Sequence, residues 1–174
     1  ALAGIVTLPP RGCALVVSRG RAGSDLVVAP PAGIHDGADC TERYNYGASI
    51  SRTAAQQTGR QFAGWRGAGA GSDTTCTVTM TAARTVSATF APLAYTLVVT
   101  RGGAGSGLVV SSPAGINCGA DCTESYNYGT TITLTAAAQT GSQFAGWSGA
   151  CAGSVPPCTV TMQAARPVTA TFAP

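Results

Sequence analysis

The sequence predicts a mainly β protein built from two tandem modules. Residues 15–92 align with residues 97–174 at a constant offset of 82 positions without a gap, and 56 of the 78 aligned positions are identical. Such self-similarity indicates a tandem duplication and sets the domain boundary. Short runs rich in Val and Thr are separated by Gly and Pro, and no segment shows a convincing helical period. We therefore expect an apolar N-terminal tail over 1–12, a first module over 13–92 and a second module over 93–174.

The expected strands are clearest in the second module, which begins with a predicted hairpin. The β-branched and apolar runs 97–100 and 108–110 flank the Gly-rich turn 102–107, a pattern typical of two paired strands. A loop rich in Pro, Gly and Asn follows over 113–121. The next strands are expected over 123–128 and 131–135. The alanine run 136–138 is long enough for one helical turn at most.

The last two expected strands show the alternation of a half-buried sheet. They cover residues 158–162 and 167–172. Val160 and Met162 point to one face, and Thr159 and Thr161 point to the other. Thr suits the solvent-facing side of a strand, so we interpret the threonine rows as exposed surface. Ice binding and O-glycosylation are the functional alternatives, and the sequence has no Asn-x-Ser/Thr acceptor.

The motif Gln-Phe-Ala-Gly-Trp occurs at residues 61–65 and again at 143–147. Large aromatic side chains bury the most surface per residue, so a small core is expected to form around them. The sequence therefore predicts four core anchors: Phe62, Trp65, Phe144 and Trp147. A glycine beside each Trp leaves space for a neighbouring strand. The functional alternative is an exposed Trp that stacks on a sugar.

Two tyrosine pairs and one arginine are candidates for a binding face. Tyr44 and Tyr46 alternate along one expected strand, as do Tyr126 and Tyr128 in the second copy. They are interpreted as a half-buried packing face, with an aromatic platform for glycans or a partner module as the alternative. Arg52 replaces Leu134 of the second copy. Because burial of an unpaired Arg is costly, this face is expected to open to solvent or to a partner.

Several motifs in the same order carry a resemblance to a known family. They are Ser-Pro-Ala-Gly-Ile-Asn-Cys-Gly-Ala-Asp-Cys (112–122), Phe-Ala-Gly-Trp-Ser-Gly-Ala-Cys (144–151) and Cys-Thr-Val-Thr-Met (158–162). Together with the preceding Val/Thr strands they resemble the divergent internalin-B-type B-repeat, over residues 15–92 and 95–174. The resemblance implies a small β-rich module, related to the β-grasp type, in a bacterial surface or secreted protein. We therefore expect two small β-rich modules, each β-grasp-like or a small sandwich, supported by disulfides. The resemblance also implies a stalk, spacer or adhesive unit, and it supplies no catalytic residue.

Seven cysteines in a chain of this size indicate an oxidising, extracellular compartment. Two pairings of the cysteines compete. A local scheme joins Cys118 to Cys122 and Cys151 to Cys158, whereas a crossed scheme joins Cys122 to Cys158 and Cys118 to Cys151. The first copy keeps Cys40 and Cys76 but has Asp36 and Gly69 at the other two positions. Since the loss of both ends of one bond is simpler than the loss of one end of each of two, the crossed scheme is favoured, with Cys40 bonded to Cys76. Cys13 is left over in either scheme, and we hypothesise that it joins neighbouring subunits.

Composition and motifs argue against several classes of function. The net charge is +3 without a basic patch, so nucleic acid is not an expected partner. No stretch approaches the roughly 18 apolar residues of a membrane span. The sole histidine, His35, is Asn117 in the other copy and is not expected to be catalytic. The recurring acids Asp39, Glu42, Asp121 and Glu124 supply too few ligands for calcium. We therefore expect no enzyme, no cofactor and no metal site.

The first eight residues are apolar and end at a Pro-Pro pair. The apolar side chains in this segment are Leu2, Ile5, Val6 and Leu8. Three interpretations are open: the segment packs on its own module, it belongs to a neighbouring domain, or it adds a strand to the next subunit's sheet. In the last case, head-to-tail donation would build an open filament. The favoured function is a non-catalytic structural or adhesive protein of the cell surface, with a filament or stalk subunit as its concrete form. The alternative is a carbohydrate-binding module of a secreted bacterial hydrolase, with surface glycans as its partners.

Overall fold

The computed structural model describes residues 12–19, 26–28 and 41–174 of the chain. All regular secondary structure in these ranges is β-strand, which confirms the prediction of a mainly β protein. The chain divides into two compact units between Ala91 and Pro92. These units are the first and second modules.

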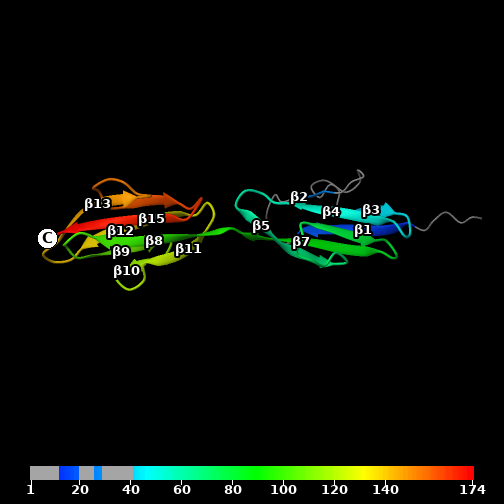
Figure 1. The fold of residues 1–174 in the computed structure, drawn as a ribbon, viewed down its shortest axis with the longest axis horizontal. Coiled ribbons are helices and arrows are strands. Elements are labelled where there is room, and N and C mark those ends of the chain that lie inside the picture. Colours follow the sequence, from blue (N-terminus) through cyan, green and yellow to red (C-terminus); the bar gives the residue numbers. More distant parts are fainter. Residues whose placement is uncertain (1–11, 20–25, 29–40) are drawn as a thin grey trace, which may run out of the picture. The chain divides into compact units, whose positions relative to one another are not determined.

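The second module is a sandwich of two four-stranded sheets (Figure 1). One sheet, the terminal-strand sheet, has the order β11-β8-β15-β13, and the other, the threonine sheet, has the order β10-β9-β12-β14. The strands are β8 (Ala94–Gly102), β9 (Gly107–Ser112), β10 (Asn117–Cys118), β11 (Thr123–Asn127), β12 (Thr131–Ala138), β13 (Gln143–Gly149), β14 (Cys158–Thr161) and β15 (Arg166–Ala173).

The described part of the first module repeats this plan. Its sheets have the orders β3-β1-β7-β5 and β2-β4-β6. The strands are β1 (Cys13–Arg19), β2 (Leu26–Val28), β3 (Thr41–Tyr44), β4 (Ser49–Ala55), β5 (Arg60–Gly67), β6 (Thr75–Thr79) and β7 (Arg84–Pro92). The strand β1 therefore corresponds to β8, and β7 corresponds to β15.

The first and last strands of each module lie side by side and run parallel. In the second module β8 pairs with β15 from Leu97 opposite Arg166 to Gly102 opposite Thr171. Figure 1 shows this pair as the green and red strands β8 and β15. In the first module β1 pairs with β7 in the same parallel sense. Because the paired strands are parallel, the chain enters each module at one end of the sheet and leaves it at the other.

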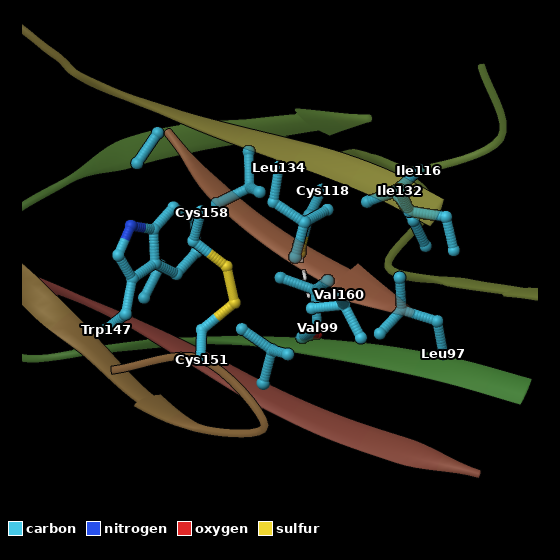
Figure 2. Close-up of a cluster of buried hydrophobic side chains, with 14 of the residues drawn as sticks. Leu97, Val99, Ile116, Cys118, Ile132, Leu134, Trp147, Cys151, Cys158 and Val160 are labelled. Carbon is cyan, nitrogen blue, oxygen red and sulfur yellow. Dashed lines mark hydrogen bonds between the residues drawn. A yellow bond between two sulfur atoms is a disulfide. The ribbon is translucent and has the colours of Figure 1, made fainter. Parts of the chain in front are cut away.

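The core of the second module lies between its two sheets (Figure 2). The terminal-strand sheet contributes Leu97 and Val99, and the threonine sheet contributes Ile132, Leu134 and Val160. Alternate residues of each strand point inward, which is why apolar side chains recur at every second position. The structure has the sandwich, rather than the β-grasp that the resemblance also allowed, because the described residues form two facing sheets and no helix.

The predicted first hairpin is wrong. The strands β8 and β9 lie in different sheets, since β8 pairs with β11 and β15 whereas β9 pairs with β10 and β12. The Gly-rich segment between them therefore crosses from one sheet to the other. Alternation shows that a strand has one buried face, but both sheets of a sandwich satisfy that pattern. The alanine run that follows residue 135 forms the end of β12 and no helical turn.

The glycine beside each tryptophan permits a close backbone approach. Gly146 has a φ of +149°, and a β-bulge separates it from Phe144. A Cβ on Gly146 would lie 3.1 Å from the carbonyl oxygen of Gly153. This close packing lets the backbone N–H of Trp147 donate to the same oxygen at 2.7 Å. The turn after β13 is thereby fixed against the strand that carries the buried Trp.

Candidate functional site

The outer face of the threonine sheet carries paired hydroxyl groups. In the second module Thr131 lies opposite Thr161, and Thr133 lies opposite Thr159. The hydroxyl oxygens of Thr131 and Thr161 are 3.4 Å apart. The first module has the same pattern on β4 and β6, where Ser51 lies opposite Thr77 with its hydroxyl 3.4 Å away. We call this array of small polar side chains the hydroxyl face.

The four predicted core anchors all lie in or against the core of their module. Trp65 and Trp147 are buried, with 5% and 6% of their surface exposed. Phe62 and Phe144 are half-buried and pack against the same cores. The ring of Phe144 lies 5.1 Å from that of Trp147 and 5.8 Å from that of Phe172. Neither tryptophan presents a ring face to a ligand.

The four candidate tyrosines do not share an exposed face. Tyr126 is buried, and its hydroxyl lies 2.8 Å from the hydroxyl of Ser111. Tyr128 follows the end of β11 and packs 6.4 Å from the ring of Tyr95. In the first module Cys13 stands at the position of Tyr95, and Tyr46, the counterpart of Tyr128, is 66% exposed.

Arg52 is fully buried, so the expectation that its surroundings open to solvent or a partner is wrong. Its Nη2 donates to the hydroxyl of Tyr44 at 3.0 Å, and its Nη1 donates to the carbonyl of Ser51 at 3.3 Å. The guanidinium also lies 5.5 Å from the centroid of the Tyr44 ring. These contacts offset part of the desolvation of the charge, although its Nε has no hydrogen-bond partner among the described residues.

The tyrosine that accepts from Arg52 differs from its counterpart in one partner. Tyr126 is engaged with Ser111, whereas the sequence has Ala29 at the position that aligns with Ser111. Ala29 carries no hydroxyl group, and among the described residues the hydroxyl of Tyr44 accepts from Arg52. The alignment of the two copies held this signal, because Ser-to-Ala and Leu-to-Arg changes occur together.

The cysteines of the second module form the local pairs. Cys118 is bonded to Cys122, and Cys151 is bonded to Cys158. The crossed scheme favoured by the sequence argument is therefore wrong. That argument compared only the number of disulfides lost in the first copy. It did not consider the turn at Asn117, whose carbonyl accepts from three successive N–H groups and brings Cys118 back towards Cys122. In the described part of the first module Cys76 is a buried free thiol, and Cys40 lies outside the described residues.

Cys76 occupies the space of the disulfide found in the second module. Gly69 aligns with Cys151, and a Cβ on Gly69 would lie 2.7 Å from the Sγ of Cys76. Burial raises the pKa of the Cys76 thiol, and the nearby Arg52 opposes that rise in part. A thiol with a raised pKa stays protonated and unreactive at neutral pH. We therefore assign Cys76 a packing role.

Gly69→Cys should form a disulfide with Cys76 and stabilise the first module by about 2 kcal/mol. The physical reason is loop closure, since a bond between residues seven positions apart restricts the unfolded chain. In the folded chain a Cβ at residue 69 already lies beside the Cys76 sulfur. Mass spectrometry of alkylated, unreduced protein would detect the bond, and denaturant unfolding would measure the gain. Gly69→Ser is the control, because it adds a Cβ and a similar heteroatom without the bond. A thiol at residue 69 that still alkylates in the folded protein would contradict the prediction.

The residues proposed for contacts between subunits are only partly described. Leu2, Ile5, Val6 and Leu8 lie outside the described residues. Cys13 is half-buried at the start of β1, opposite Tyr44 in the register of β1 and β3, and it packs against the core of the first module. Its hypothesised bond to a neighbouring subunit remains a proposal.

The recurring acidic residues bind their own backbone. The carboxylate of Glu42 accepts from the N–H of Arg43 at 2.9 Å, and that of Glu124 accepts from Ser125 at 2.7 Å. Asp121 accepts from the N–H of Thr123 at 3.2 Å. His35 and Asp39 lie outside the described residues. Within the described ranges, no three His, Cys, Asp or Glu side chains lie close enough together to hold a metal ion.

An open depression of about 450 Å³ lies over the Gly-rich segment after β8. Its lining comprises residues 99–103, 105–107 and Cys122. Two polar groups of the lining are engaged within the module. Nη1 of Arg101 donates to the carbonyl of Gly107 at 3.0 Å, and the N–H of Ser106 donates to the hydroxyl of Ser142 at 2.9 Å. The residues that line the depression include no carboxylate, histidine or free thiol that could act in acid–base or nucleophilic chemistry.

These features define a class of protein: a duplicated, disulfide-supported β-sandwich repeat. The sequence matches the family model described as the divergent InlB B-repeat domain twice, over residues 27–94 and 95–174. The chain belongs to this family, which confirms the resemblance drawn from its motifs. No curated protein matches the sequence. Among the described residues, no helix has the length and apolar character needed to cross a membrane.

Proposed function

We propose that the chain is a non-catalytic structural or adhesive part of a bacterial protein at the cell surface or in the extracellular medium. The observation that carries this proposal is the parallel pairing of the first and last strands in each module. It places the chain's entry and exit at opposite ends of each module, so the length of the module separates the segments attached to its two ends. This arrangement suits a stalk or spacer.

The surfaces and the interior support the same proposal. The described cores are filled by apolar side chains and, in the second module, by a disulfide. Disulfides persist in oxidising compartments, which supports an extracellular location. The hydroxyl face presents small polar side chains in both modules. Membership of a repeat family adds the expectation of a tandem, surface-associated context.

The finer proposal is that the chain assembles head to tail through residues 1–8. It rests on the apolar sequence of that segment and on the sheet edges formed by β11, β13 and β14, each of which has one hydrogen-bonded neighbour. A strand edge accepts an added strand through its unpaired backbone groups. Assembly of this kind repeats one contact and grows into a filament when its rotation does not close.

Negative-stain electron microscopy and sedimentation of the purified chain would test this proposal. Filaments are expected for the full chain and single particles for a variant that lacks residues 1–8. Ile5→Asp with Val6→Asp should act like the deletion, because buried charges oppose strand addition. Thr7→Ser is the matched control and should still assemble. Single particles in every sample would leave a spacer or a binding module and remove self-assembly.

A carbohydrate-binding role is the second candidate, and the exposed ring of Tyr46 is the observation that favours it. An exposed aromatic ring offers a stacking face for a sugar. A glycan screen would show binding that Tyr46→Ala abolishes and that Tyr128→Ala leaves intact. Absence of binding, or binding that survives Tyr46→Ala, would remove this candidate.

A further inference from the structure

We propose that each module is a tension-resisting element, in which the parallel pair of terminal strands carries the force in shear. The inference deepens the proposed structural role and rests on it for its biological meaning. The central observation is that β8 and β15, which hold the two ends of the second module, are neighbours in the middle of one sheet. Tension on the two ends therefore pulls these strands along each other in opposite directions.

The register of the pair determines how force is shared. Six residue pairs join β8 to β15, from Leu97 opposite Arg166 to Gly102 opposite Thr171. The hydrogen bonds of a parallel ladder are evenly spaced along the strands. A pull along the strand axis loads all of them at once. A pull that separates the two strands at one end would break them one after another, which requires less force.

The outer neighbours of the pair add to this resistance. β11 is bonded along β8 from Val98 opposite Thr123 to Ala94 opposite Asn127. β13 is bonded along β15 on the other side, from Gln143 opposite Ala173 to Gly149 opposite Val168. Neither terminal strand is a sheet edge, so each must slide against two neighbours before it can leave the sheet.

The buried side chains oppose a slip in register. Val168, Ala170 and Phe172 of β15 point into the core, whereas Thr169 and Thr171 point outward. A slip by one residue would turn the apolar side chains outward and the threonines inward. The ring of Phe172 also packs against Phe144 on β13. The first step of extension therefore exposes apolar surface in addition to breaking the ladder.

The disulfides do not bridge the terminal strands. Cys118–Cys122 links β10 to the residue before β11, and Cys151–Cys158 links the turn after β13 to β14. Both bonds close short loops, and neither joins β8 to β15. The hydrogen bonds and packing of the strand pair must therefore carry the tension. The same pairing in the first module, from Leu15 opposite Arg84 to Arg19 opposite Ala88, predicts the same behaviour there.

Single-molecule force spectroscopy of the full chain would test the inference by comparing two pulling directions. The first pulls through the two chain ends. The second pulls between residue 104 and the C-terminus, which lie just beyond the adjacent ends of β8 and β15. Ala104→Lys provides a handle, since the sequence contains no other Lys. We expect the rupture force of the second module to be severalfold higher between the chain ends. Similar forces in both directions would overturn the inference.

A pair of conservative variants separates mechanical resistance from stability. Val168 on β15 and Val160 on β14 are both buried, with 1% and 3% exposed. Val168→Ala should lower the rupture force between the chain ends, whereas Val160→Ala should lower stability to denaturant with little effect on that force. Equal loss of force in both would contradict the role of the terminal pair. Reduction identifies the second module, because it lengthens the extension of the module that holds both described disulfides. The result of the force measurements does not change the result of the assembly test, so the proposed function and this inference are tested independently.

Discussion

Leu134→Arg should destabilise the second module by about 3–5 kcal/mol, the cost of an uncompensated buried charge. Leu134 is fully buried between the two sheets (Figure 2). The tyrosine hydroxyl that receives the guanidinium in the first module is already engaged at this site, where Tyr126 bonds to Ser111. The new Arg would lose its hydration in a core that fits the smaller leucine side chain. Denaturant unfolding followed by circular dichroism should show an earlier transition for one module.

Arg52→Leu is the reciprocal control. It restores the apolar residue of the second copy and removes a charge whose Nε has no partner among the described residues. Replacement of buried ionic groups by apolar residues of similar volume is often neutral or stabilising by about 1–4 kcal/mol. Tyr44→Phe combined with Arg52→Leu should recover any cost of the hydroxyl left without its donor. If Arg52→Leu instead destabilised the protein as much as Leu134→Arg, the two modules would not differ in the way proposed, namely that only the first accommodates a buried Arg at this position.

Trp147→Ala should cost about 3–5 kcal/mol, because it removes a buried ring and leaves a cavity between the sheets. The ring packs against Phe144 and the disulfide-bonded Cys151 and Cys158 in the same core (Figure 2). The measurement is again the free energy of unfolding from denaturant curves. Val155→Ala on the neighbouring loop is the control, since Val155 is 71% exposed and its truncation should change stability by about 0.5 kcal/mol or less.

A comparison of the two tryptophans refines this prediction. Nε1 of Trp65 donates to the carbonyl of Asp73 at 2.9 Å, whereas Nε1 of Trp147 has no partner among the described residues. Trp147→Phe should therefore lose less stability than Trp65→Phe, which also breaks a hydrogen bond. Loss of a sugar-binding activity in Trp147→Ala at unchanged stability would contradict the assignment of this residue as a core anchor.

The local sequence pattern predicted the strands well, because apolar and polar residues alternate along a strand that has one buried face. Val160 and Met162 are buried and Thr159 and Thr161 are exposed, as their alternation indicated. The pairing of strands was not accessible in the same way. The segments that became β8 and β9 have the composition of a hairpin, yet they belong to different sheets, because the choice depends on contacts with β15 and β12, far along the chain.

The candidate site was harder to predict because its chemistry depends on paired changes. Arg52 alone suggests an exposed position, and only its contact with Tyr44 explains its burial. Gly69 looks like an isolated loss of a cysteine until its closeness to the retained Cys76 is seen. In both cases the difference between the copies held the information. Reading it required knowledge of which aligned residues touch, which composition and periodicity do not contain.

The parallel terminal strands also bear on how this protein can change its size over generations. A strand of eight residues such as β15 spans about 26 Å, so each copy moves the next attachment point by at least that distance. Duplication of a copy needs no new fold and no change within existing copies. Each added copy would thus contribute one more module of the same length, with its entry and exit at opposite ends.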